Sequence, residues 1–206
     1  MTKKDFKKEL KEVYNTSSKK ISIIQVPKIN YIMIDGTDDP NKKEYQESIS
    51  TLYKVAFTIK FMIKKQNIDN DYVVMPLECL WWADDVSAFK EKRTKEWFWT
   101  LMIMQPDIIT KDIIKEAINI VKEKNDLFNL EKMYIKSIQE KTSIQLMHIG
   151  PYDEEEITIN KLHDFCKNNG YIINGKHHEI YISDPRKTKK EKLKTIIRYP
   201  VKIIQK

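Results

Sequence analysis

Glu179 and Tyr181 are the two side chains of this sequence best placed to do chemistry. They lie in an alternating run that begins at His177, and along a strand every second side chain points to the same face. His177, Glu179 and Tyr181 are therefore expected on one face. Ile180 is expected on the other face, beneath a helix. A carboxylate beside a phenol can transfer a proton or bind a cation, although a solvated surface glutamate is the simpler explanation of any single Glu.

A second candidate feature is a concentration of aromatic residues, because all four tryptophans lie between Trp81 and Trp99. Alternation places Trp82 on one face of its strand, with Glu78, and Trp81 on the other. Core packing explains one or two tryptophans. Four of them near a carboxylate also suit stacking on a flat or cationic ligand.

The elements that position these residues occur twice along the chain. Both copies have the order strand, turn with Gly and Pro, helix, strand, charged loop and strand, and Gly36 and Gly150 mark equivalent turns. The expected strands are 21–26, 31–35, 72–82, 96–104, 143–149, 177–183 and 195–203, and the expected helices are 42–65, a connector through 113–121, and 154–168.

The repeated order predicts an α+β fold of two pseudo-symmetric strand–helix–strand–strand units, with antiparallel sheets facing a central ligand cleft. We expect a basic N-terminal segment, 1–20, and one domain, 21–206. Within that domain, unit one spans about 29–106, a connector helix about 107–130, and unit two about 143–204.

Composition excludes several classes of protein. The 206 residues, 41% of them hydrophobic, suffice for a packed core, and no apolar run approaches the ~20 residues of a membrane span. The two cysteines, Cys79 and Cys166, suit buried positions in a reducing cytoplasm rather than a disulfide framework. No metal-ligand spacing or phosphate-binding glycine loop is present, so no metal or cofactor is expected.

The net charge of +7 is concentrated at the two ends, since residues 1–20 carry +4 and residues 185–206 carry +8. The remaining chain is mildly acidic. Basic ends can contact phosphate backbones, but solvated tails explain them more simply and no recognition-helix pattern is present. A nucleic-acid partner is not expected, and the sequence leaves the oligomeric state open.

Several segments resemble the GyrI-like small-molecule-binding family. They are Met147-His-Ile-Gly-Pro-Tyr152, His178-Glu-Ile-Tyr-Ile-Ser-Asp-Pro185 and Lys192-Leu-Lys-Thr-Ile-Ile-Arg-Tyr-Pro-Val201. Two tryptophan-bearing segments, 74–85 and 96–106, are similar to a stand-alone bacterial branch that includes cyclopropanoid cyclopropyl hydrolases. The family's cleft glutamate corresponds to Glu179. The second carboxylate that the family often has after the threonine of its last strand is absent, because Ile196 follows Thr195.

The resemblance implies two functions that use the same residues. The first is cytoplasmic binding of hydrophobic, aromatic or cationic small molecules. The alternative is a hydrolase that opens the cyclopropane of spirocyclopropyl-cyclohexadienone DNA alkylators. In it Glu179, with a pKa raised by burial, would deprotonate water, and Tyr181 would donate to the dienone oxygen. A third hypothesis, association with nucleic acid or protection of gyrase, rests only on the basic ends.

The predicted site combines both features. Glu179 and Tyr181 are the candidate catalytic residues, and the candidate ligand-binding residues are Glu78, Trp81, Trp82, Trp97, Trp99, Met104, His148, Tyr152, Glu179 and Tyr181.

Overall fold

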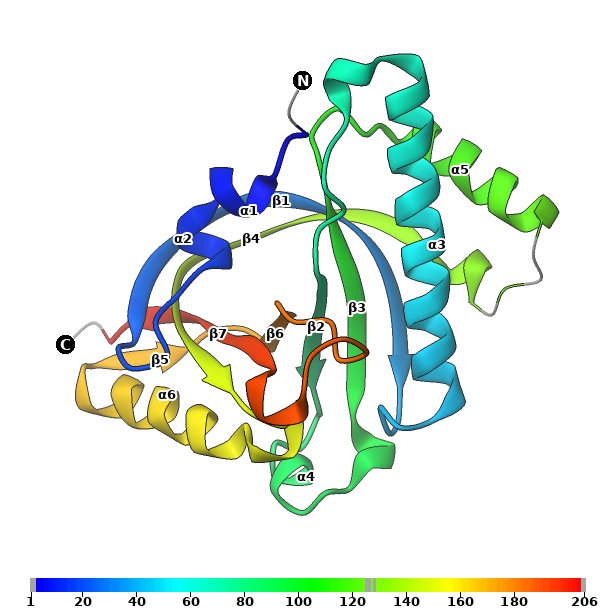
Figure 1. The fold of residues 1–206 in the computed structure, drawn as a ribbon. Coiled ribbons are helices and arrows are strands. Elements are labelled where there is room, and N and C mark those ends of the chain that lie inside the picture. Colours follow the sequence, from blue (N-terminus) through cyan, green and yellow to red (C-terminus); the bar gives the residue numbers. More distant parts are fainter. Residues whose placement is uncertain (1–2, 125–126, 128, 205–206) are drawn as a thin grey trace. The chain divides into compact units, whose positions relative to one another are not determined.

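The computed structural model describes residues 3–124, 127 and 129–204 (Figure 1). The chain divides into two compact units. Unit 1 comprises residues 1–9 and 29–138, and unit 2 comprises residues 10–28 and 139–206. Two long strands, β1 (Ser22–Thr37) and β4 (Tyr134–Ile149), each run from one unit into the other.

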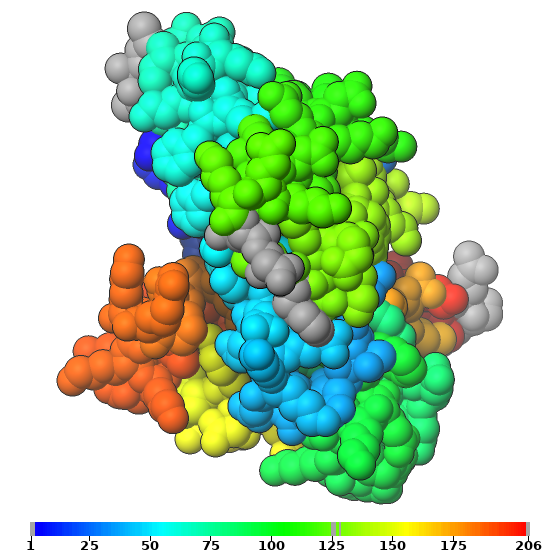
Figure 2. Space-filling model, turned by 90° about the vertical axis from the view of Figure 1, so that its right-hand side faces the viewer, coloured from blue at the N-terminus to red at the C-terminus, as the bar shows by residue number. Residues whose placement is uncertain are grey.

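Unit 1 contains antiparallel strands with a long helix packed against them (Figure 1). Its central strand is β3 (Phe98–Gln105), which pairs with β1 on one side and with β2 (Leu77–Trp82) on the other. Helix α3 (Lys43–Gln66) packs on this sheet, and α5 (Lys111–Lys124) lies alongside α3 at the surface of the unit (Figure 2).

Helix α3 forms because its apolar residues recur every three or four positions. The buried stripe includes Tyr45, Leu52, Val55, Ala56, Ile59 and Ile63. The helix also buries Lys60, whose Nζ lies 2.6 Å from Asp71 Oδ1, so the charge is paired rather than isolated. The predicted helix 42–65 is confirmed to within one residue at each end.

Unit 2 is built around β7 (Lys194–Ile203), which is antiparallel to three strands. Residues Lys194–Pro200 pair with β4, residues Thr195–Arg198 pair with β6 (His177–Tyr181), and the last residues of β7 pair with the short β5 (Tyr171–Ile173). Helix α6 (Glu156–Asn168) packs Leu162 and Cys166 against Ile144 and Leu146 of β4, and against Ile197, Tyr199 and Val201 of β7.

The antiparallel α+β fold predicted from the sequence is confirmed, and several element boundaries differ from it. Strand β1 continues through Pro27, where we expected it to stop. Pro27 is exposed, so the missing N–H is tolerated. The expected strand 72–82 begins only at Leu77, after Pro76, and Tyr72 instead forms an isolated bridge with Lys4. Strand β5 and the short helix α4 (Ser87–Lys90) were not predicted.

The basic N-terminal segment is not simply a solvated tail, and that expectation is wrong for residues 10–15. Two short helices, α1 (Phe6–Glu9) and α2 (Lys11–Tyr14), lie there, and Val13 and Tyr14 are each only 3% exposed. The Glu12 and Val13 carbonyls accept hydrogen bonds from Gln145 and Arg198 of unit 2. The short apolar pair in a lysine-rich run was too weak a pattern to indicate this burial.

Candidate functional site

The candidate site lies on the face of the unit 2 sheet that α6 covers. In an antiparallel pair, directly opposite residues share a face. Glu179 is opposite Ile197, which packs with Leu162 of α6, whereas Ile180 is opposite Ile196 on the other face. The expectation that Ile180 packs beneath this helix and Glu179 points away from it is therefore wrong. The spacing of two grouped these residues correctly. His178 and Ile180 are buried and His177, Glu179 and Tyr181 are partly buried, so neither face is plainly a solvent face, and alternation alone does not say which one meets the helix.

Two side chains on the same strand hold the Glu179 carboxylate. His177 Nε2 donates to Oε1 at 2.8 Å, and the Tyr181 hydroxyl donates to Oε2 at 2.6 Å. The side chain of Glu179 is 14% exposed, so solvent reaches it only partly. Hydrogen bonds to a charged acceptor are stronger than neutral ones. The arrangement therefore fixes the direction in which this carboxylate points.

The hydrogen-bonded chain extends beyond His177 to β7. His177 Nδ1 lies 2.6 Å from the hydroxyl of Tyr199, and the two rings are 5.1 Å apart. Burial and the nearby Glu179 carboxylate raise the pKa of Tyr199, so its hydroxyl stays protonated. Burial, with His177 close by, lowers the pKa of His163 on α6, whose ring packs on Tyr199. The site thus contains a continuous chain of proton donors and acceptors.

A second carboxyl group, Glu155, belongs to this site and was not predicted. It precedes α6, is 4% exposed, and lies beside Glu179. Burial, the charge of Glu179 and a hydrogen bond with that carboxyl raise the pKa of Glu155 far above its usual range, although the Thr195 hydroxyl lowers it somewhat. Two carboxyls this close cannot both ionise easily. Near neutral pH the pair therefore holds one proton, carried by Glu155.

The other two candidates of unit 2, Tyr152 and His148, have different surroundings. Tyr152 is 41% exposed and its ring contacts Tyr181 edge-on at 5.6 Å, so these two predicted residues come together. His148 is buried at 6% exposure, with Nδ1 3.0 Å from the Thr158 hydroxyl and Nε2 3.1 Å from the Pro151 carbonyl oxygen. Both of its ring nitrogens are thus used to hold the turn before α6.

The opposite face of the unit 2 sheet carries a separate buried ion cluster. Glu140 accepts from Arg198 Nη1 at 3.1 Å and lies 3.0 Å from His178 Nδ1. Although burial alone would raise it, His178 and Arg198 lower the pKa of Glu140 to about 2. Arg198 is completely buried and also donates to Gln145 and to the Val13 carbonyl. This cluster attaches the N-terminal segment to the sheet.

The candidates of unit 1 lie on two faces of its sheet, as alternation predicted. Trp81 is opposite Trp99 on the α3 side, and Tyr45 of α3 contacts both rings, at 5.5 and 5.2 Å. Trp99 is fully buried. A Cβ on Gly36 would lie 2.1 Å from its ring, so this glycine makes room for the indole. Trp81 and Trp99 are thus packed in the hydrophobic core of unit 1.

The other face of that sheet carries Glu78, Trp82 and Met104. Glu78 is completely buried and accepts a hydrogen bond from the Tyr31 hydroxyl at 3.3 Å, and Met104 is opposite Tyr31 on β3. Trp82 is half-buried and stacks on Phe98 with 5.6 Å between ring centroids. Trp82 is therefore only partly buried and lies on the opposite face from Trp81.

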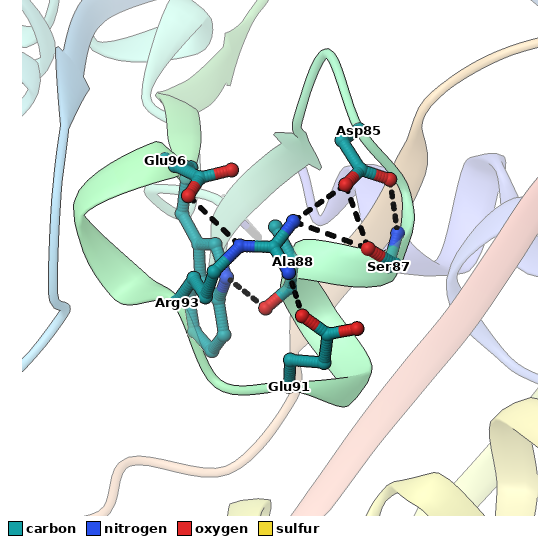
Figure 3. Close-up of polar contacts among 7 residues, drawn as sticks. Asp85, Ser87, Ala88, Glu91, Arg93 and Glu96 are labelled. Carbon is teal, nitrogen blue, oxygen red and sulfur yellow. Dashed lines mark hydrogen bonds and ion pairs between the residues drawn. The ribbon is translucent and has the colours of Figure 1, made fainter.

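Trp97 is held by the charged loop that follows β2. Its indole Nε1 donates to the Ala88 carbonyl at 3.1 Å, and its ring contacts Phe89 at 5.2 Å. Arg93 fixes this loop by pairing with Asp85, Glu91 and Glu96 (Figure 3). The predicted charged loop is thus organised around one guanidinium group, and it positions a half-buried tryptophan.

The residues that the structure describes contain neither a metal-binding cluster nor a membrane-spanning helix. No group of three His, Cys, Asp or Glu side chains among them could hold a metal ion. No helix in the described part of the chain is long and apolar enough to cross a membrane.

Comparison with known proteins shows which family this chain belongs to. Residues 19–202 match the model of the GyrI-like small molecule binding domain, and the chain belongs to that family. No curated protein matches.

Three solved structures from Listeria innocua are similar over nearly their whole length. An uncharacterized conserved protein is 39% identical with a TM-score of 0.88, covering 96% of this chain and 99% of that one. A protein described as a hydrolase is 37% identical with a TM-score of 0.82 and the same coverage. Another described as a hydrolase is 36% identical with a TM-score of 0.84, covering 98% of this chain and 100% of that one.

Proposed function

We propose that this small-molecule-binding domain is a hydrolase of flat aromatic compounds, with Glu179 as the base that activates water. The observation that carries the proposal is the carboxyl pair. Glu179 is held by His177 and Tyr181, and the protonated Glu155 lies beside it. A neutral carboxyl beside a second carboxylate leaves the negative charge on the latter, which can then accept a proton from water. The hydrolase descriptions of two relatives at 36% and 37% identity support this choice over binding alone.

The geometry suits a general base. Glu179 accepts hydrogen bonds from His177 and Tyr181 and shares one with Glu155, and a carboxylate has about four acceptor positions, so a water can bind beside these partners. His177 and Tyr181 prevent the side chain from rotating away. Cys166 packs near Tyr199, but burial raises the pKa of its thiol, which makes it a poor nucleophile. Direct attack of water is therefore the simplest route to hydrolysis.

The substrate class that we propose is the spirocyclopropyl-cyclohexadienone. Its cyclopropane is already strained, so one directed proton transfer, typically worth about 10²–10⁴ in rate, is a sufficient contribution. Opening the ring would detoxify a DNA alkylator. The dienone oxygen and the attacked carbon lie at opposite ends of the substrate ring. Tyr181, hydrogen-bonded to Glu179, therefore serves better to orient the base than to donate to that oxygen.

Binding without reaction is the second candidate function, and the family description favours it directly. In that case Glu179 would pair with a cationic group, and aromatic side chains would stack on the ligand. We retain Trp82 and Trp97 as proposed stacking residues, since both are half-buried rather than enclosed in the core. We also retain the cytoplasm as the proposed location, which suits the two free, buried cysteines.

The test is incubation of the purified protein with a spirocyclopropyl dienone, followed by mass spectrometry for the product that has gained one water. We expect ring opening by the wild type and a loss of about 10²–10⁴-fold in Glu179→Gln. Glu156→Gln, an exposed carboxylate next to Glu155, is the matched control and should keep wild-type turnover. Tight binding of the compound with no product would support the binding function and overturn the hydrolase.

A further inference from the structure

Two buried oxygens of the unit 2 site have no hydrogen-bond partner among the described residues. They are Oε1 of Glu155 and Oγ1 of Thr195. The first residue is 4% exposed and the second is completely buried. An unpaired buried polar atom costs about 1–3 kcal/mol, so such atoms are rare unless a water or a ligand satisfies them. Two of them in one site indicate a bound polar group.

Both oxygens lie beside the Glu179 carboxylate. The Glu155 carboxyl shares a hydrogen bond with Glu179, and the Thr195 hydroxyl faces Glu155 closely enough to lower its pKa. The Thr195 hydroxyl and Glu155 Oε1 nevertheless do not reach normal hydrogen-bond geometry with each other, so neither satisfies the other. Thr195 is also directly opposite Tyr181, which donates to Glu179. The start of α6, β6 and β7 thus each contribute one oxygen-bearing group to the same small volume.

We propose that Glu155 and Thr195 bind the water molecule that Glu179 deprotonates. The inference rests on the proposed hydrolase function. A buried water needs two to four polar partners, and these three side chains supply them. The Thr195 hydroxyl donates to the water oxygen, and one water hydrogen is donated to Glu155 Oε1. The other hydrogen points to Glu179, which leaves a lone pair of the water free to attack.

The step balances without any co-reactant. Glu179 takes one proton from water as the oxygen forms a bond to the cyclopropyl carbon. The carbon–carbon bond of the cyclopropane breaks, and its electron pair enters the ring, which becomes a phenolate. The phenolate takes a proton from solvent and Glu179 returns its proton to solvent, so the net reaction is the addition of one water. Glu155 keeps its proton throughout, because its role is to hold the water and leave the negative charge on Glu179.

Thr195 offers a matched pair of variants. Thr195→Val has the same shape without the hydroxyl, and we expect its kcat to fall by roughly 10- to 100-fold with KM unchanged, since it loses one buried hydrogen bond to the attacking water. Thr195→Ser keeps the hydroxyl and should remain within about threefold of the wild type. Wild-type kcat in Thr195→Val would overturn the assignment.

Glu155 is tested by the pH profile. In the wild type kcat should fall at alkaline pH, as Glu155 ionises and a second negative charge forms beside Glu179. Glu155→Gln stays neutral and retains an oxygen to accept from the water, so it should be active and lack this alkaline fall. An unchanged alkaline fall in Glu155→Gln would overturn the role of Glu155.

A crystal structure separates this inference from the proposed function. We expect a water within hydrogen-bond distance of Glu155 Oε1 and Thr195 Oγ1 in the wild type and none in Thr195→Val. Such a water in a protein that does not open the dienone would refute the substrate and leave the water site standing. Direct contact between the two side chains, with no water, would refute the site whatever the turnover.

Discussion

Replacing Glu155 by Gln should make the stability of this protein less sensitive to pH. Glu155 is buried next to Glu179, and its pKa in the folded protein lies far above the value of 4.5 that applies when the chain is unfolded. The folded state therefore binds one more proton than the unfolded state between these two values. Stability must fall as pH rises through that interval.

The loss of stability that Glu155 causes at pH 7 can be calculated from one condition, that its pKa in the folded protein is above 7. Keeping Glu155 protonated at pH 7 then costs 1.36 kcal/mol for each of the 2.5 units between 4.5 and 7, or about 3 kcal/mol. This cost vanishes below pH 4 and is absent from the Gln variant at every pH. The difference in unfolding free energy between wild type and Glu155→Gln should therefore change by about 1.4 kcal/mol per pH unit.

Urea unfolding at pH 5, 6, 7 and 8 measures this slope. Any constant effect of the substitution, such as an altered hydrogen bond, shifts all four differences equally and does not change their slope. Glu156→Gln is the control, because that carboxylate is exposed and should give a difference independent of pH. Parallel pH dependence of wild type and Glu155→Gln would refute the assignment of a buried, protonated carboxyl to this position.

Three further predictions concern packing. Arg198→Met should destabilise the protein by about 3–5 kcal/mol in urea unfolding, because it leaves Glu140 buried without its guanidinium partner; Lys202→Met, at an exposed site on the same strand, should cost less than about 1 kcal/mol. Gly36→Ala should cost about 1–3 kcal/mol through the clash with Trp99, measured in the same way, and a wild-type midpoint would contradict the packing described for this ring. Trp99→Ala should cost about 3–5 kcal/mol, since its ring is fully buried, whereas Trp82→Ala should affect stability less and weaken ligand binding in calorimetry.

The sequence predicted the parts of the fold that depend on local periodicity. The stripe of α3 and the two faces of β2 follow from spacings of 3.6 and 2, so the helix and the separation of Trp82 from Trp81 were predicted correctly. The spacing of strand residues also grouped His177, Glu179 and Tyr181, which do lie together. Periodicity does not show which face of a strand packs against a helix. Whether Glu179 or Ile180 meets α6 depends on the register with β7, which pairs residues far apart in the chain.

Glu155 shows the same limit at the level of a single residue. It lies in a run of four acidic residues, from Asp153 to Glu156, at the start of a helix, where acidic side chains are common because they favour the positive end of the helix dipole. Glu155 differs from the other acidic residues of this run only because of the two strands beside it, β6 and β7. Glu179 of β6 and Thr195 of β7 surround it, while the adjacent Glu154 and Glu156 are exposed. His148 holds the turn that precedes α6, and it is directly opposite Thr195 on the neighbouring strand. We therefore expect His148 to position both Glu155 and Thr195, and so to influence the chemistry of the site.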